Sequence, residues 1–184
     1  MASTLLLQYL EELAHNAAGA PVLDLACGNG RNGLALVAAG MPVVFADRDV
    51  TKLESVEQQL SAASYREHAH LAELWSIDFE LPGSRPLHQK FYSAILVFRY
   101  LHRPLLPAIK QAISPGGLVI YETFTVDQAE LGRPRNPDYL LQHGELEACF
   151  KDWEILQSFD GIVENDKLQQ HQALAQIVAR RPLA

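Results

Sequence analysis

The sequence has few cysteines, no surplus of basic residues and no long apolar run. Only Cys27 and Cys149 are present, far apart in the chain, which excludes a disulfide framework and favours a reducing cytoplasm. The formal net charge is −7, and phosphate contacts need a surplus of Lys and Arg, so nucleic acid is not expected as a partner. No window approaches the roughly 18 apolar residues of a membrane span. We therefore expect a cytoplasmic protein without a membrane partner.

What is present is typical of one globular α/β domain. Of 184 residues, 48% are hydrophobic and 20% are charged, and two independent cores would each be small for such a length. We expect residues 1–184 to form a single domain. Residues 1–19 are predicted to form an amphipathic helix, because Leu6, Leu10 and Leu13 recur at intervals of three or four.

Short apolar runs alternate with helical segments along the chain. The predicted strands are residues 21–26, 42–49, 71–80, 91–100, 118–124, 153–163 and 172–180. The first five alternate with helices, which predicts a parallel sheet with right-handed crossovers, and the last two are close enough to pair as an antiparallel hairpin. Asp49 is placed to cap the helix that follows the second strand, and Pro115-Gly116-Gly117 predicts a turn before the fifth strand.

The stretch VLDLACGNGRNG, residues 22–33, has the spacing of a dinucleotide-binding fingerprint. Asp24 lies on the strand, four residues before Gly28. Its carboxylate would repel the pyrophosphate of a dinucleotide, whereas it attracts the sulfonium and ammonium groups of S-adenosylmethionine. Asp24 therefore favours S-adenosylmethionine over NAD. Asp47 ends the second strand and can accept hydrogen bonds from a ribose diol, which both cofactors carry.

Five segments in order resemble the motifs of class I S-adenosylmethionine-dependent methyltransferases: VLDLACGNGRNGLAL, VVFADRD, SIDFE, AILVFRYLHRPLLP and ISPGGLVIYETF. Within this class the chain resembles the small tellurite-resistance-type enzymes. The resemblance implies a Rossmann-like, doubly wound, seven-stranded sheet of order 3-2-1-4-5-7-6 with strand 7 antiparallel and helices on both faces. It also implies an enzyme that transfers a methyl group and releases S-adenosylhomocysteine.

The resemblance also assigns the cofactor site. The methionine part is placed at Asp24, Ala26, Cys27, Gly28, Asn29 and Gly30, the ribose at Asp47, the adenine at Arg48, Asp78 and Phe79, and the methionyl end at Val97, Phe98 and Arg99. Ala26 departs from the pattern, because the family usually has its first glycine there.

The loop RYLHRP, which follows the fourth strand, lines the crevice expected at the carboxyl edge of the sheet. Small methyltransferases need a base only where the acceptor is protonated, and His102 is the predicted general base, with Tyr100 beside it. The alternative is that His102 is an ordinary packed histidine. No group of residues predicts a metal site, since Glu67-His68-Ala69-His70 is better explained as a solvated loop.

Residues 125–143 are rich in Gly, Pro and Asn and form a candidate substrate loop. The predicted substrate-binding residues are Arg103, Glu122, Arg133, Arg135 and Tyr139. The three arginines among them and Arg99 would converge on one crevice. Four arginines there suggest a small acceptor with an anionic group. The alternative is that the arginines make surface ion pairs. Glu122 either braces one of them or touches the acceptor.

The sequence leaves three other functions open. A noncatalytic module could bind S-adenosylmethionine or support a partner subunit. A second alternative is a methyltransferase that acts on RNA or protein. The net charge disfavours RNA as the substrate, but the arginines at the edge of the sheet keep it open. A NAD-dependent oxidoreductase would use the same glycine spacing, and Asp24 argues against it.

Overall fold

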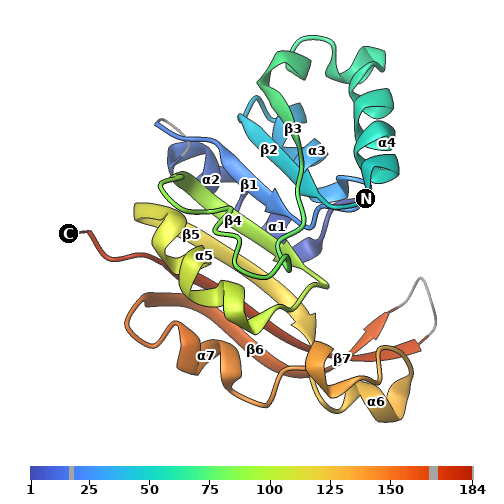
Figure 1. Cartoon of the computed structure of the whole chain (residues 1–184), viewed down its shortest axis with the longest axis vertical. Coiled ribbons are helices and arrows are strands. Elements are labelled where there is room, and N and C mark those ends of the chain that lie inside the picture. The colour runs from blue at the N-terminus through green and yellow to red at the C-terminus, as the bar shows by residue number, and fades with distance from the viewer. Residues whose placement is uncertain (17–18, 166–169, 184) are drawn as a thin grey trace.

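A seven-stranded sheet runs through the protein, whose computed structural model describes residues 1–16, 19–165 and 170–183 (Figure 1). The strands are β1 (Val22–Leu25), β2 (Val43–Asp47), β3 (Ala72–Ser76), β4 (Tyr92–Phe98), β5 (Ile113–Phe124), β6 (Glu154–Asn165) and β7 (Gln170–Arg180). Their order is β3-β2-β1-β4-β5-β7-β6, and only β7 runs antiparallel to the neighbours on both its sides. The predicted order and direction of the strands are confirmed.

Helices cover both faces of the sheet, as predicted. They are α1 (Thr4–Leu7), α2 (Leu10–Asn16), α3 (Arg31–Ala38), α4 (Val50–Leu60), α5 (Leu106–Ala112), α6 (Gln128–Leu131) and α7 (Glu145–Cys149), with 3₁₀ turns at Ala63–Tyr65, Ala69–Leu71, Arg103–Leu105 and Pro137–Tyr139. The first four helices share one apolar cluster with the sheet, while α5 and α7 share the other. Every residue of β1 and β4 is buried, as expected for parallel strands covered on both faces.

The amino-terminal segment differs from the single helix expected over residues 1–19. It forms two short helices, because the Tyr9 N–H bonds to the Leu6 carbonyl, three residues back, and tightens the chain between them. Residues 17 and 18 lie outside the described part of the chain. Within that part, no helix is both long and apolar enough to cross a membrane.

The fifth strand also begins earlier than predicted. Pro115-Gly116-Gly117 forms a bulge inside β5, where the pairing with β4 jumps from Tyr92 opposite Ile113 to Ala94 opposite Leu118. A β-carbon on Gly117 would lie 2.5 Å from the Ser93 carbonyl oxygen, so only glycine fits there.

Two connections near the strand ends shape the functional region. Residues 77–91, between β3 and β4, contain no helix. The predicted substrate loop, residues 125–143, is held at its base by a bridge between Thr125 and Leu141, and it contains α6 and the 3₁₀ turn Pro137–Tyr139. Asp49 caps α4 as predicted, accepting the Thr51 N–H at 3.0 Å.

Candidate active site

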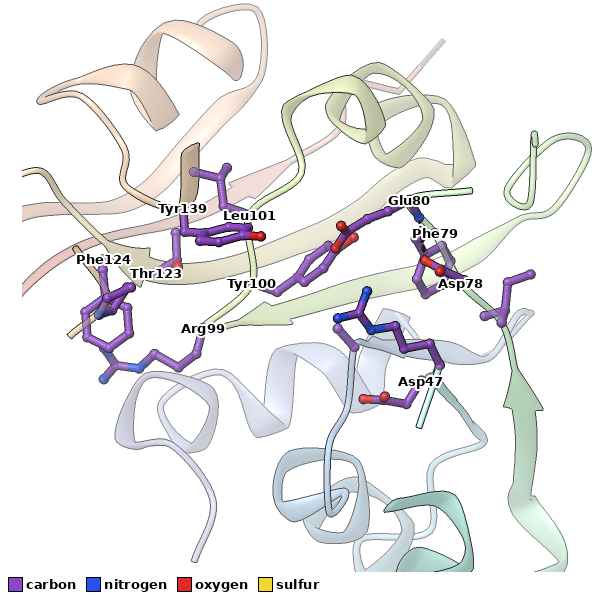
Figure 2. A pocket seen from close by; sticks show the side chains of 14 residues that line it. Asp47, Asp78, Phe79, Glu80, Arg99, Tyr100, Leu101, Thr123, Phe124 and Tyr139 are labelled. Carbon is purple, nitrogen blue, oxygen red and sulfur yellow. Dashed lines mark hydrogen bonds between the residues drawn. The ribbon is translucent and has the colours of Figure 1, made fainter. Parts of the chain in front are cut away.

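Two adjoining cavities open at the carboxyl ends of the central strands. The central cavity, about 420 Å³, is lined by Ala26, Asp47, Arg48, Ile77, Asp78, Phe79, Glu80, Arg99, Tyr100, Leu101, Thr123, Phe124, Pro134 and Tyr139 (Figure 2). The glycine-loop cavity, about 630 Å³, is lined by Asp24, Ala26, Cys27, Gly28, Asn29, Arg31, Asn32, Phe98, Arg99, Phe124 and Gln172. Ala26, Arg99 and Phe124 belong to both, so the two cavities meet above the tips of β1, β4 and β5.

Asp24 is a buried carboxylate at the glycine-loop cavity. Its side chain accepts the Gly33 N–H at 2.8 Å, and the residue is only 2% exposed. Burial raises its pKa to about 7, to which the nearby Asp47 adds, while the Gly33 N–H and the positive charge of Arg31 act in the opposite direction. The ionised form of Asp24 therefore lacks full compensation from the protein, which suits a cationic ligand.

Asp47 joins the tip of β2 to the glycine turn. One carboxylate oxygen accepts the Gly28 N–H at 2.8 Å and the other accepts the Asp49 N–H at 2.9 Å. The residue is partly exposed in the central cavity. Because each carboxylate oxygen has two lone pairs, both oxygens keep capacity to accept a further hydrogen bond.

The glycines of the turn have different roles. A β-carbon on Gly30 would lie 2.7 Å from Val56 of α4, so this glycine is required by packing within the protein. At Gly28, nothing lies within 4 Å of the same position, and the backbone φ is +55°. Gly28 is therefore the position where the turn leaves room for a ligand. Ala26 has a φ of 52°, a left-handed conformation that explains why glycine is usual there.

The remaining predicted cofactor residues divide into lining and core residues. Arg48, Asp78 and Phe79 line the central cavity, as placed by the resemblance. The Asp78 carboxylate accepts the Glu80 N–H at 2.9 Å, and the Phe79 ring packs edge-on against Trp75, with ring centroids 5.7 Å apart.

Of three further predicted residues, two line the glycine-loop cavity and one lies in the core. Val97 is fully buried in the core and its side chain lines neither cavity, whereas Phe98 lines the glycine-loop cavity. Cys27 also lines that cavity, and burial raises the pKa of its thiol, so the thiol is protonated at neutral pH.

Arg31 was missed by the sequence analysis. It is the first residue of α3, and it lines the glycine-loop cavity with Asp24. This arrangement places a guanidinium group and a carboxylate around one cavity. The signal that could have found Arg31 is its position directly after Gly30, where a side chain follows the ligand-facing turn.

Glu122 braces Arg99, which is one of the two interpretations that the sequence left open. The Glu122 carboxylate lies 3.3 Å from the Arg99 guanidinium and also accepts a hydrogen bond from Gln176 at 2.7 Å. Gln172 accepts a hydrogen bond from the Arg99 guanidinium at 3.1 Å, and the guanidinium lies 4.5 Å from the centre of the Phe124 ring. Arg99 has a φ of 59°, so this network holds it in a strained backbone conformation.

The predicted convergence of four arginines is wrong. Arg103 donates two hydrogen bonds to Glu145, at 2.7 and 2.9 Å, and others to the carbonyls of Asp138 and Leu140, and it lines neither cavity. Glu145 of α7 therefore pairs with the Arg103 guanidinium, which was expected to face a ligand.

The two loop arginines are also outside the cavities. Arg133 and Arg135 are exposed, and the Arg135 side chain bonds to the Gly132 carbonyl at 3.2 Å. The substrate loop reaches the central cavity through Pro134 and Tyr139 instead.

Of the two candidate catalytic residues, only Tyr100 reaches the central cavity. His102 lines a third, lateral cavity of about 770 Å³, between residues 79–91 and the start of α5. The prediction that His102 faces the ligand crevice is therefore wrong, because the chain leaves the central cavity after Leu101. The Tyr100 hydroxyl is buried and lies next to the Glu80 side chain. Burial and the charge of Glu80 raise its pKa.

The model of the family described as tellurite resistance protein TehB matches residues 10–175. The chain belongs to the TehB family. The match extends from α2 into β7 and so includes every strand whose tip borders the two cavities. The family expected from the motifs is confirmed. A comparison with curated proteins gives no match.

Solved structures of TehB and other methyltransferases share the fold. TehB from Haemophilus influenzae is 21% identical, with a TM-score of 0.72, and the alignment covers 95% of this chain and 62% of that one. This chain therefore spans less than two thirds of that TehB. An S-adenosylmethionine-dependent methyltransferase from Methanosarcina mazei is 16% identical, with a TM-score of 0.68 and coverages of 94% and 98%. The glycopeptide N-methyltransferase MtfA, solved with S-adenosylmethionine, is 15% identical, with a TM-score of 0.60 and coverages of 95% and 86%.

Proposed function

We propose that this member of the TehB family is an S-adenosylmethionine-dependent methyltransferase that acts on a small-molecule acceptor. The observation that carries the proposal is the arrangement of Asp24 and Asp47, which end neighbouring parallel strands and border two adjoining cavities. A buried, poorly compensated carboxylate beside an open glycine turn matches a ligand that is cationic at one end and carries a ribose in its middle.

The glycine-loop cavity fits the methionine part of this cofactor. That part is a zwitterion next to a sulfonium, so it needs a negative and a positive partner. Asp24 supplies the carboxylate, and Arg31 supplies a guanidinium group that can bind a carboxylate in a bidentate manner. Gly28 leaves open space in this cavity.

The central cavity fits the adenosine part. Asp47 retains acceptor capacity for the ribose hydroxyls, Asp78 can accept from the adenine amine, and Phe79 and Arg48 offer an apolar surface and a stacking group. When bound, S-adenosylmethionine supplies an electrophilic methyl group. The protein contributes orientation of both reactants and exclusion of water, and such positioning supplies much of the rate acceleration in bimolecular reactions.

The size and the charge of the site support a small acceptor. The central cavity is enclosed partly by the substrate loop through Tyr139 and Pro134, and its volume of about 420 Å³ is that of a small-molecule pocket. The net charge of −7 disfavours RNA. Arg103, Arg133 and Arg135 do not line the central cavity, so the hypothesis that the acceptor carries an anionic group loses its main support. Both cysteines carry free thiols, as is usual in the cytoplasm.

Calorimetric titration with S-adenosylmethionine, S-adenosylhomocysteine and NAD tests the cofactor. We expect binding of the two sulfur-containing ligands, no binding of NAD, and at least tenfold weaker binding in Asp24→Asn and Asp47→Asn. Glu54→Gln, an exposed acid on α4 away from both cavities, is the matched control and should bind as the wild type does. Binding of NAD alone would contradict the proposal and favour an oxidoreductase.

A screen for methyl transfer separates an enzyme from a binding module. The protein is incubated with methyl-labelled S-adenosylmethionine and with small-molecule, peptide and RNA acceptors, and the transfer of label is measured. Transfer to small molecules is the expected result. Normal cofactor binding without transfer to any class would instead support a noncatalytic module.

A further inference from the structure

The outer part of the central cavity is walled by aromatic rings. Tyr100, Phe124 and Tyr139 all line it, and Tyr139 is half exposed on the substrate loop. The Arg99 guanidinium already lies 4.5 Å from the centre of the Phe124 ring. Figure 2 shows Tyr100 and Tyr139 bordering the same space, with Tyr100 extending toward Glu80. The rings available to a ligand are therefore those of the two tyrosines.

The charges around this cavity are predominantly negative. Its charged lining residues are Asp47, Asp78, Glu80, Arg48 and Arg99. Glu122, which is outside the lining, pairs with Arg99 at 3.3 Å and offsets its charge. Three carboxylates therefore face one guanidinium whose charge is not offset.

We infer that this part of the cavity binds an acceptor carrying a protonated amine on a flat apolar group. An ammonium group is attracted to the faces of aromatic rings, and Tyr100 and Tyr139 provide two of them. The Glu80 carboxylate gives the same group an ionic hydrogen-bond acceptor, and the hydroxyl oxygen of Tyr100 beside it gives a neutral one. The inference rests on the proposed function, because it names the acceptor of the same site.

Glu80 also has a role in proton transfer from the bound amine. An ammonium nitrogen has no free electron pair, so it must lose a proton before it can be methylated. The Glu80 carboxylate would accept that proton. It borders both the central and the lateral cavity, which places it between the amine site and a second solvent-connected space. A carboxylate at this position suits an amine better than an anionic acceptor, which it would repel.

The test compares three probes that share a phenylethyl group and end in a positive, a neutral or a negative group: 2-phenylethylamine, 2-phenylethanol and 3-phenylpropionate. The whole protein, labelled with ¹⁵N and saturated with S-adenosylhomocysteine, is titrated with each probe at pH 7.5, and dissociation constants are taken from backbone chemical shifts. We expect the amine to bind about tenfold tighter than the alcohol and tighter still than the carboxylate. Shift changes should centre on residues 99–101 and 134–139.

Two variants assign the preference to residues. Glu80→Gln keeps the shape of the side chain and should reduce the preference for the amine over the alcohol to less than about threefold. Tyr139→Leu should weaken the amine more than the alcohol, since it removes a ring but keeps an apolar surface. Glu130→Gln, an exposed acid on α6 that lines none of the three cavities, should leave all three dissociation constants unchanged.

Several results would overturn the inference. Tighter binding of 3-phenylpropionate than of the amine would assign the site to anions through Arg99. Absence of binding for all three probes, or an amine preference that survives in Glu80→Gln, would also contradict it. Failure of S-adenosylhomocysteine to bind refutes the proposed cofactor instead. The probes are then titrated into the free protein, where the amine preference is decided separately.

Discussion

The Asp24 carboxylate accepts the Gly33 N–H at 2.8 Å, and the two approach so closely because Gly33 has no side chain. A β-carbon there would lie 2.9 Å from the carboxylate oxygen and 2.3 Å from the Phe45 ring. The third glycine of the fingerprint thus sets the depth at which α3 packs on β1. Gly33 thereby determines where the Asp24 carboxylate lies, while Gly28 leaves room for the ligand.

Gly33→Ala should lower the free energy of unfolding by about 1–3 kcal/mol, the usual cost of overpacking a filled core. Urea denaturation measures this change. Alanine would normally favour a helix over glycine, so a destabilisation here reports the clash. The control is Gly19→Ala, because nothing lies within 4 Å of that β-carbon and its φ is not positive. Equal stability of the two variants would disprove the packing role.

Asp24→Asn should stabilise the ligand-free protein at high pH. Burial raises the folded-state pKa of Asp24 to about 7, well above 3.8, the ordinary value for an aspartate. The contribution of Asp24 to the free energy of unfolding is therefore fully present below pH 3.8 and is lost as the pH rises through about 7. Asn removes this dependence while keeping an acceptor for Gly33. We expect a gain of about 1–2 kcal/mol at pH 8.5 and a much smaller gain at pH 5.5, measured by urea denaturation. A gain independent of pH would contradict the assignment.

The affinity for S-adenosylhomocysteine should increase with pH through the same range. Its ammonium group is attracted to the ionised form of Asp24, and that form is populated above pH 7 if the pKa is about 7. Below this pKa, the dissociation constant should rise by at most about tenfold per pH unit. Calorimetry from pH 5.5 to 8.5 tests this, and the weaker binding of Asp24→Asn should vary little with pH. An affinity of the wild type that falls with pH would assign the dominant titration to another group.

Glu122→Gln should destabilise the protein more than the loss of an exposed ion pair does. The side chain of Glu122 is 7% exposed and that of Arg99 is 28% exposed, so removing one charge leaves the other in a largely desolvated place. We expect a loss of about 1–2 kcal/mol by chemical denaturation. Asp152→Asn is the matched control, since Asp152 pairs with Lys110 at 2.6 Å but is 63% exposed, and the loss should stay below about 1 kcal/mol.

Most of the fold follows from local patterns. Apolar runs of strand length that alternate with helical segments give the sheet, and Asp24 and Asp47 are at strand ends because charge interrupts those runs. The motifs locate the candidate cofactor residues for the same reason, since these residues lie at or shortly after the ends of strands. The strand order depends on contacts distant in sequence, and only the resemblance to a family provided it.

The substrate side could not be predicted, because ion-pair partners are chosen by the tertiary structure. Arg103 and Glu145 are 42 residues apart, so no local pattern indicates that they bond. His102 and Tyr100 are two residues apart, yet they line different cavities. The direction of a side chain after a strand end depends on the backbone turn, and here the φ of 59° at Arg99 determines it.

The two ends of the substrate loop are anchored by backbone hydrogen bonds, and its middle is held by fewer contacts. Hydrogen bonds from Val126 to Leu141 and from Leu141 to Phe124 close its base, and Arg103 holds the carbonyls of Asp138 and Leu140. These contacts use backbone atoms of the loop. The buried Gln128 side chain also holds the loop, because it accepts the Ala173 N–H at 2.9 Å and donates to the Arg133 carbonyl at 3.1 Å. Residues 129–135 can therefore be exchanged during evolution with less effect on the sheet than the rest of the loop. Divergence of acceptor preference among related proteins is expected to concentrate there, while the strand tips stay the same.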